Sequence, residues 1–135
     1  MERLNLEIIT PERVVVSEEV DSVEAKGALG EFGILPGHVQ FLTLLEIGEI
    51  TYTQGNVTRC LATSGGFAEV DDNKVTFLVD TTEFAEEIDI ERAKRALERA
   101  EKELKELSVE EKEFKQYELA LMRAMTRISA ASKKL

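Results

Sequence analysis

Four arginines near the C-terminus are the residues whose type and spacing best suit ligand binding. Arg92 and Arg99 are seven residues apart in the sequence. Arg123 and Arg127 are four residues apart. Each pair therefore shares one face if its segment is helical. A guanidinium group offers a planar fork of donors and stays charged at any working pH, so four of them folded together would suit a polyphosphate.

The alternative is that these arginines lie on a solvated helix surface. Carboxylates one helical turn away would then pair with cations of the same helix, as in Glu98–Lys102 and Glu101–Lys105. Spacing alone favours this second interpretation over a ligand site.

The sequence contains no set of residues that is arranged for catalysis. His38 is the only histidine, and no serine or cysteine lies near it in the sequence for it to activate. Cys60 is the only cysteine, which excludes an internal disulfide and suggests a reducing compartment. One cysteine and one histidine are too few for a structural zinc site. We therefore expect a binding or mechanical protein with no catalytic residue and no metal ligand.

The chain is long enough for one domain, or for one small domain with an appendage. It has 135 residues, 43% of them hydrophobic, and a net charge of −10. No segment approaches the roughly 20 apolar residues of a membrane span, and the first residues leave no room for a signal peptide. An acidic chain is also a poor candidate for non-specific nucleic-acid binding, because that binding relies on lysine and arginine.

Two parts of the chain differ in composition. All eight glycines and both prolines lie within the first 66 residues. Residues 1–87 contain 5 basic and 17 acidic side chains, whereas residues 88–135 contain 12 basic and 10 acidic ones. Since the turn residues stop before the charge changes, we expect one domain at residues 1–86 and a second at residues 87–135.

The first part has the pattern of short strands. Apolar and polar residues alternate in Leu4–Ile8, and similar short segments continue as far as Lys74–Val79. Turn sequences separate several of them, for example residues 54–56 and 71–73. This pattern predicts an antiparallel sandwich or barrel.

The second part has the pattern of two helices. Apolar residues recur at steps of three and four, at positions 90, 93, 97, 100, 104 and 107 and again at positions 114, 117, 121, 124, 128 and 131. Asp89 is a candidate N-cap for the first helix, and Ser108–Glu111 is a candidate capping box for the second. The link is then short and the helices antiparallel. Alanine accounts for a large share of the apolar positions of the first helix and buries little area. The hairpin should therefore pack weakly and could separate from the sandwich.

Several motifs resemble one known family in the same order along the chain. They are Gly30–His38 (GEFGILPGH), Thr63–Val70 (TSGGFAEV), Ile88–Ala93 (IDIERA) and Glu118–Ile128 (ELALMRAMTRI). Together they resemble the epsilon subunit of F-type ATP synthases over essentially the whole chain. The resemblance implies an all-β sandwich of about ten antiparallel strands, followed by a two-helix hairpin.

The resemblance also implies a function. The family's sandwich lies at the foot of the rotor stalk, against the gamma subunit and the polar loops of the c-ring, and it couples ion flow to rotation. Its hairpin can extend along gamma toward the alpha and beta catalytic subunits and inhibit ATP hydrolysis. The chain would then be a non-catalytic, peripheral subunit at the cytoplasmic face of the bacterial inner membrane. The alternative is a free-standing sandwich with a nucleotide-sensing hairpin.

The glycine-rich segment around His38 is the expected partner interface. It carries apolar residues that suit a contact with gamma or the c-ring, although they could instead plug the end of the sandwich. The interface residues expected here are Glu31, Phe32, Ile34, Leu35 and His38.

A nucleotide site is the last implication of the resemblance. Residues 88–93 match the family's ATP motif (Ile or Leu, Asp, two variable residues, Arg, Ala), and four further residues match positions associated with that site. ATP, with Mg²⁺ accompanying it, is thus expected as a regulatory and not an obligatory ligand. The expected site residues are Glu83, Ile88, Asp89, Arg92, Ala93, Arg99, Arg123 and Arg127.

Overall fold

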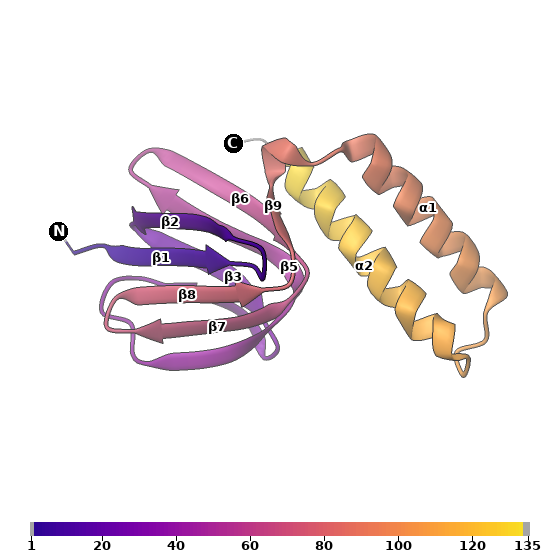
Figure 1. Cartoon of the computed structure of the whole chain (residues 1–135), viewed down its shortest axis with the longest axis horizontal. Coiled ribbons are helices and arrows are strands. Elements are labelled where there is room, and N and C mark those ends of the chain that lie inside the picture. The colour runs from indigo at the N-terminus through magenta and orange to yellow at the C-terminus, as the bar shows by residue number, and fades with distance from the viewer. Residues whose placement is uncertain (1, 134–135) are drawn as a thin grey trace.

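Nine strands, a short 3-10 turn and two helices follow one another in the computed structural model, which describes residues 2–133 (Figure 1). Their bounds are β1 Leu4–Ile9, β2 Val14–Val20, β3 Ser22–Gly27, β4 Gly30–Ile34, β5 Phe41–Gln54, β6 Val57–Thr63, β7 Gly66–Asp71, β8 Lys74–Val79, β9 Thr82–Phe84, η1 Ala85–Glu87, α1 Ile90–Glu106 and α2 Lys112–Ser132. The predicted sandwich and hairpin are confirmed.

Strand pairing differs from the expectation in one respect. The strands pair in the order β2-β1-β8-β7-β5-β3-β4, with β6 on β5 and β9 on β6. All of these pairs are antiparallel except β1 with β8. Because β1 and β8 lie far apart in the sequence, no tight turn forces them to run in opposite directions.

The long strand β5 connects the two halves of the sandwich. Its first residues pair with β7, from Phe41 opposite Val70 to Leu45 opposite Gly66. Its later residues pair with β3 and with β6, and the latter pairing starts at Gly48 opposite Thr63. One strand therefore contributes to both layers of the core.

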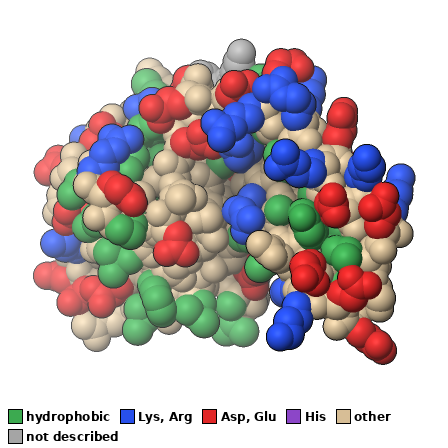
Figure 2. All heavy atoms as spheres, turned by 45° about the vertical axis from the view of Figure 1, so that its right-hand side comes forward, with side chains coloured by type: hydrophobic (Ala, Val, Ile, Leu, Met, Phe, Trp, Pro, Cys, Tyr) green, Lys and Arg blue, Asp and Glu red, His purple; other side chains and the backbone are tan. Residues whose placement is uncertain are grey.

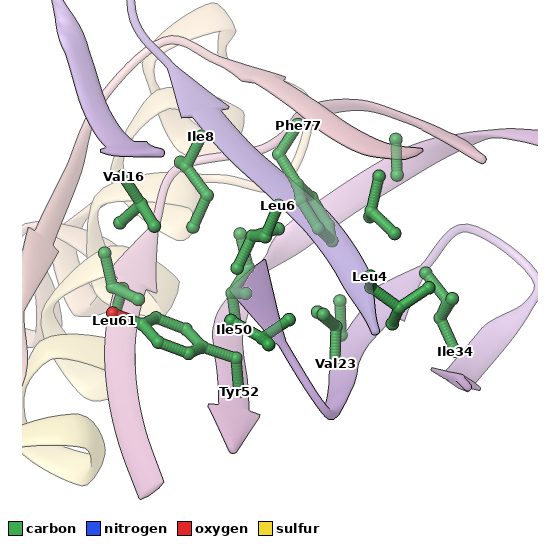
Figure 3. Close-up of a cluster of buried hydrophobic side chains, with 14 of the residues drawn as sticks. Leu4, Leu6, Ile8, Val16, Val23, Ile34, Ile50, Tyr52, Leu61 and Phe77 are labelled. Atoms are coloured by element: carbon green, nitrogen blue, oxygen red, sulfur yellow. The ribbon is translucent and has the colours of Figure 1, made fainter. Parts of the chain in front are cut away.

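The core of the sandwich is built from alternating positions of these strands. Leu4, Leu6 and Ile8 of β1 are at most 1% exposed, which confirms the alternation expected for this segment. Figure 3 shows these side chains converging with others from β3, β4, β5 and β8. The labelled members from those strands are Val23, Ile34, Ile50, Tyr52 and Phe77.

Ile34 corrects the predicted partner interface. We expected it among the contact residues, but its side chain is 1% exposed and belongs to the core. Residues 30–34 form the strand β4 instead of a loop, and its register places Ile34 opposite Val23. Ile34 thus closes the sandwich, whereas its neighbour Leu35 is 64% exposed.

Gly66 permits a close backbone approach at the start of β7. Its φ is +148°, and a Cβ atom at this position would lie 2.0 Å from the backbone oxygen of Leu78. Only glycine lets β7 start here beside β8. This tight passage also sets the position of the adjoining Ser64, which is hydrogen-bonded to Thr81.

The helices begin in different ways. The Asp89 side chain accepts a hydrogen bond of 3.0 Å from the backbone N–H of Arg92, which confirms the predicted N-cap of α1. The Ser108 backbone N–H donates to the Glu111 side chain, but α2 begins only at Lys112. Residues 108–111 therefore close a turn before the helix, and the predicted capping box begins α2 too early.

Small side chains hold the hairpin together and dock it on the sandwich. Ala93 and Ala100 of α1 and Ala124 of α2 are buried along the hairpin. The docking cluster consists of Ala130 and Ala131 of α2 against Cys60, Ala62, Ala85 and Ile88. In Figure 1, α2 lies between α1 and the sandwich. Because alanines bury little area, this docking is weak in hydrophobic terms.

Candidate functional site

A cleft of about 440 Å³ lies between the sandwich and the hairpin. This volume falls within the usual range for small-molecule sites. The sandwich contributes residues of β6 and β9 and their neighbours to this cleft, and the hairpin contributes residues of both α1 and α2. Its lining residues are Ala62, Thr63, Ser64, Thr81, Thr82, Glu83, Ala96, Ala120, Arg123, Ala124, Thr126 and Arg127.

Three of the predicted nucleotide-site residues meet in this cleft. Glu83 comes from β9, and Arg123 and Arg127 come from successive turns of α2. The Arg127 Nε donates to a Glu83 carboxylate oxygen at 2.5 Å, and both side chains are about 30% exposed. The two cations thus share one face of α2, as their spacing predicted, and the structure adds that both line the cleft.

The two arginines of α1, Arg92 and Arg99, do not line the cleft. Ala96 lines it, and Arg92 and Arg99 lie four residues before and three residues after this alanine. Residues at these spacings occupy one stripe of a helix, so both arginines lie on the side of α1 that carries Ala96. Both are exposed. Figure 2 shows basic side chains over the hairpin and at its boundary with the sandwich.

The remaining predicted residues shape the hairpin outside the cleft lining. Ile88 is 8% exposed and packs in the docking cluster. Asp89 caps α1, as described above. Ala93 is fully buried. Thus the first part of the motif fixes where α1 starts, and its alanine lets the two helices approach closely.

A second ion pair, which the sequence analysis missed, joins the end of α2 to the sandwich. The Lys133 ammonium group donates to the Glu49 carboxylate of β5 at 2.5 Å. Burial opposes ionisation of Glu49, but hydrogen bonds from Lys133 and Ser129 outweigh it, so the pKa of Glu49 is lowered. The nearby Cys60 thiol donates weakly to the same carboxylate, and burial followed by the Glu49 charge raises the pKa of Cys60 to about 11.

We expect the carboxyl group of Glu49 to titrate below its ordinary pKa of 4.5. Because the docked hairpin lowers this pKa, the pair stabilises docking above pH 4.5 and loses that contribution as the pH falls through the docked-state value. Replacing Lys133 with Ala should raise the pH at the midpoint of the Glu49 titration. Carboxyl ¹³C chemical shifts as a function of pH measure both values, with the exposed Glu69 as an internal control. A Glu49 midpoint that does not move in Lys133→Ala would contradict the pairing.

The predicted partner interface is only partly exposed. Glu31 and Leu35 are exposed, whereas Phe32 and His38 are half-buried. The ring centroids of Phe32 and His38 lie 5.3 and 5.6 Å from that of Phe41. The aromatic residues thus stiffen this end of the sandwich, and Glu31 and Leu35 remain free of the core to contact another molecule.

An apolar stripe on the outer face of the sandwich was also missed. We define it as Leu42 and Leu44 of β5, Phe67 of β7 and Leu78 of β8, which are 50–69% exposed. Leu44 lies opposite Phe67, and Phe67 lies opposite Leu78, so the residues form a row across three strands. In Figure 2, hydrophobic side chains gather along the lower edge of the sandwich. Runs without alternation, such as Phe77-Leu78-Val79, are the sequence signal for strands covered on both faces.

The part of the chain that the structure describes offers no group of three His, Cys, Asp or Glu residues that could hold a metal ion. Neither helix within residues 2–133 is long and apolar enough to cross a membrane.

Comparisons with known proteins agree over the whole length of the chain. Residues 3–85 match the beta-sandwich domain of the ATP synthase delta/epsilon chain, and residues 86–132 match its long alpha-helix domain. The chain is 54% identical to the ATP synthase epsilon chain of Geotalea daltonii over 132 residues, which cover 98% of this chain and 96% of the relative. It is 52% identical to the epsilon chain of Geobacter sulfurreducens with the same coverage.

Solved structures give the same result. A chain in the OSCP/F1/c-ring part of the Euglena gracilis mitochondrial ATP synthase superposes with a TM-score of 0.83 at 28% identity, covering 95% of this chain and 81% of that one. A chain from the central stalk and c-ring of the Tetrahymena thermophila enzyme has the same fold, with a TM-score of 0.62 at 14% identity over 98% of this chain and 96% of that one. The chain therefore belongs to the ATP synthase delta/epsilon chain family, as an epsilon-type, non-catalytic stalk subunit of the F-type enzyme.

Proposed function

We propose that this subunit couples ion translocation to ATP synthesis through its sandwich and restrains ATP hydrolysis through its hairpin. The observation that carries the proposal is the contrast between the two parts. The sandwich has a continuous apolar core, whereas the hairpin is docked on it by alanines and two ion pairs. A rigid part suits torque transmission, and a weakly held part suits a switch between two positions.

The apolar stripe is proposed as the docking surface for the gamma subunit. A row of half-exposed large side chains across three strands is typical of a protein interface. Glu31 and Leu35, at the end of the same sandwich, are proposed to face the polar loops of the c-ring. This arrangement would place the subunit at the cytoplasmic face of the bacterial inner membrane, as a peripheral component.

The cleft is proposed as a regulatory ATP site. Its volume and its arginines fit a nucleotide polyphosphate, and Mg²⁺ bound to the phosphates would neutralise part of their charge. A polyphosphate would compete with Glu83 for Arg127, because the guanidinium now donates to that carboxylate. Since both helices border the cleft, the ligand would favour the folded hairpin over an extended one that reaches the alpha and beta subunits.

We expect Phe67→Asp to weaken the complex with gamma by about 30-fold or more. A charge at the centre of an apolar contact loses its hydration and finds no partner there, which costs at least about 2 kcal/mol. Titration of gamma with the isolated subunit, monitored by calorimetry, measures the affinity.

Val57→Asp is the matched control. Val57 is 56% exposed, close to the 50% of Phe67, but it lies at the start of β6, outside the stripe. Equal loss of binding in both variants would rule out the stripe as the specific contact. Failure of the unmodified chain to co-purify with gamma and the catalytic ring would favour the free-standing sensor instead.

A further inference from the structure

We infer that the Lys133–Glu49 ion pair is a latch, which sets the fraction of molecules with a docked hairpin when no nucleotide is bound. The inference rests on the proposal that the hairpin undocks. It adds which contact controls the undocking.

The position of the pair is the first argument. Lys133 is the C-terminal cap of α2, and Glu49 lies in β5, 84 residues earlier in the chain. The Glu49 side chain is only 16% exposed, and Ser129 lies one helical turn before Lys133, on the same side of α2. The Lys133 side chain is 54% exposed, so solvent screens the pair in part, but a charge-assisted hydrogen bond to a largely buried carboxylate is at the strong end of such pairs.

The weakness of the other contacts is the second argument. The docking cluster consists of four alanines, one cysteine and one isoleucine, so it buries little apolar area. A single charged hydrogen bond can therefore shift the balance between the docked and undocked forms. The same bond inside a large apolar interface would have less effect.

The location relative to the cleft is the third argument. Arg127–Glu83 lies within the proposed nucleotide site, so a ligand would alter that pair. Lys133 and Glu49 instead line a neighbouring groove of about 670 Å³, between α2 and the strands β3, β4 and β5, which shares only Thr126 with the cleft. The other charged residues of this groove are Glu24, Lys26 and Glu31. A ligand in the cleft would therefore leave the latch unaltered, and salt should weaken the latch because the groove is open to solvent.

Cys60 provides a direct measurement of docking in the full chain. It is the only cysteine, it is 1% exposed, and it faces the docking cluster. Its reaction with Ellman's reagent in native buffer should follow the population of the undocked form. The Lys133→Ala substitution could change the Cys60 reaction rate in two ways, and these two effects have opposite directions. Loss of a nearby cation would disfavour the thiolate and slow the reaction, whereas undocking would accelerate it.

We expect Lys133→Ala to react roughly fivefold faster than the unmodified chain. Lys133→Arg should react within about twofold of it, because arginine can still donate to Glu49. Lys94→Ala is the control, since Lys94 is exposed on α1 and makes no ion pair within residues 2–133.

Two further measurements test the ion pair itself. Added salt should increase the rate of Cys60 modification more in the unmodified chain than in Lys133→Ala. Glu49→Gln should accelerate amide exchange at Ala130 and Ala131, while Lys133 stays at the helix end.

Two different results would overturn the inference. In the first, the free energy of opening at Cys60 in the unmodified chain is well below the free energy of global unfolding, but Cys60 reacts no faster in Lys133→Ala. The hairpin is then mobile, and the latch is absent. If Cys60 reacts only through global unfolding in every variant, the hairpin does not undock by itself. That second result would contradict both the latch and the proposed switch.

Discussion

Replacing Ile34 with Asp is expected to destabilise the sandwich strongly. The side chain is 1% exposed and packs in the core between β4 and its neighbours, with no cation among the core residues to pair with a carboxylate. Burying an unpaired charge of this kind costs about 4 kcal/mol or more. Since a domain of this size is stable by about 5–15 kcal/mol, a quarter or more of the stability would be lost. Urea denaturation followed by circular dichroism measures the change.

Leu35→Asp is the control, because the two positions are adjacent and differ mainly in burial. Leu35 is 64% exposed, so the new carboxylate would remain hydrated. We expect its unfolding midpoint to stay close to that of the unmodified chain. Should Ile34→Asp also unfold at the unmodified midpoint, Ile34 would have to lie on the surface, as we first expected for a partner contact.

This pair of residues shows why the interface could be predicted only in part. Two consecutive large apolar residues after a glycine-rich segment suited a loop, because Gly30 and Gly33 hid the strand β4. Which of two neighbours points inward depends on strand register, and the pairing of β4 with β3 sets that register. The antiparallel alternation of Leu4–Ile8 needed no such information, and it was predicted correctly.

The helices were easier to predict because their signals are local. The cap at Asp89 and the three- and four-residue steps depend on residues within one or two turns. The start of α2 was wrong because Ser108 and Glu111 can close a turn as readily as begin a helix. Local hydrogen bonds of a capping box therefore do not fix the first helical residue by themselves.

The shared helix face of Arg123 and Arg127 was predictable from the sequence, but the contacts across the boundary were not. Spacing shows which arginines share a helix face, and the structure adds that β9 and α2 bring Glu83 to Arg127. The partner of Lys133 could not be chosen from sequence, because residues 1–87 contain 17 carboxylates. Only the tertiary fold selects Glu49 among them.

ATP is expected to bind the isolated subunit, and Arg127→Ala is expected to weaken that binding by about 30-fold or more. Arg127 lines the cleft on the side of the sandwich, where its guanidinium already donates to an oxyanion. Losing a charged, forked donor to phosphate costs about 2 kcal/mol or more. Calorimetric titration with ATP in the presence of Mg²⁺ measures the affinity. Lys94→Ala is the control, since Lys94 is exposed and lies two residues after Arg92 and five before Arg99, on the opposite side of α1.

The bound nucleotide should also close the hairpin, and this second result separates a regulatory site from a passive one. At a concentration about 100 times the dissociation constant, a ligand specific for the docked form stabilises it by roughly 2.7 kcal/mol. The reaction of Cys60 should then slow by up to about 100-fold, both in the unmodified chain and in Lys133→Ala, because the latch lies outside the cleft. Binding that leaves the Cys60 rate unchanged would show that ATP does not distinguish the two forms. In that case the arginines would bind nucleotide without regulating the subunit, since a ligand shifts an equilibrium only by its difference in affinity for the two states.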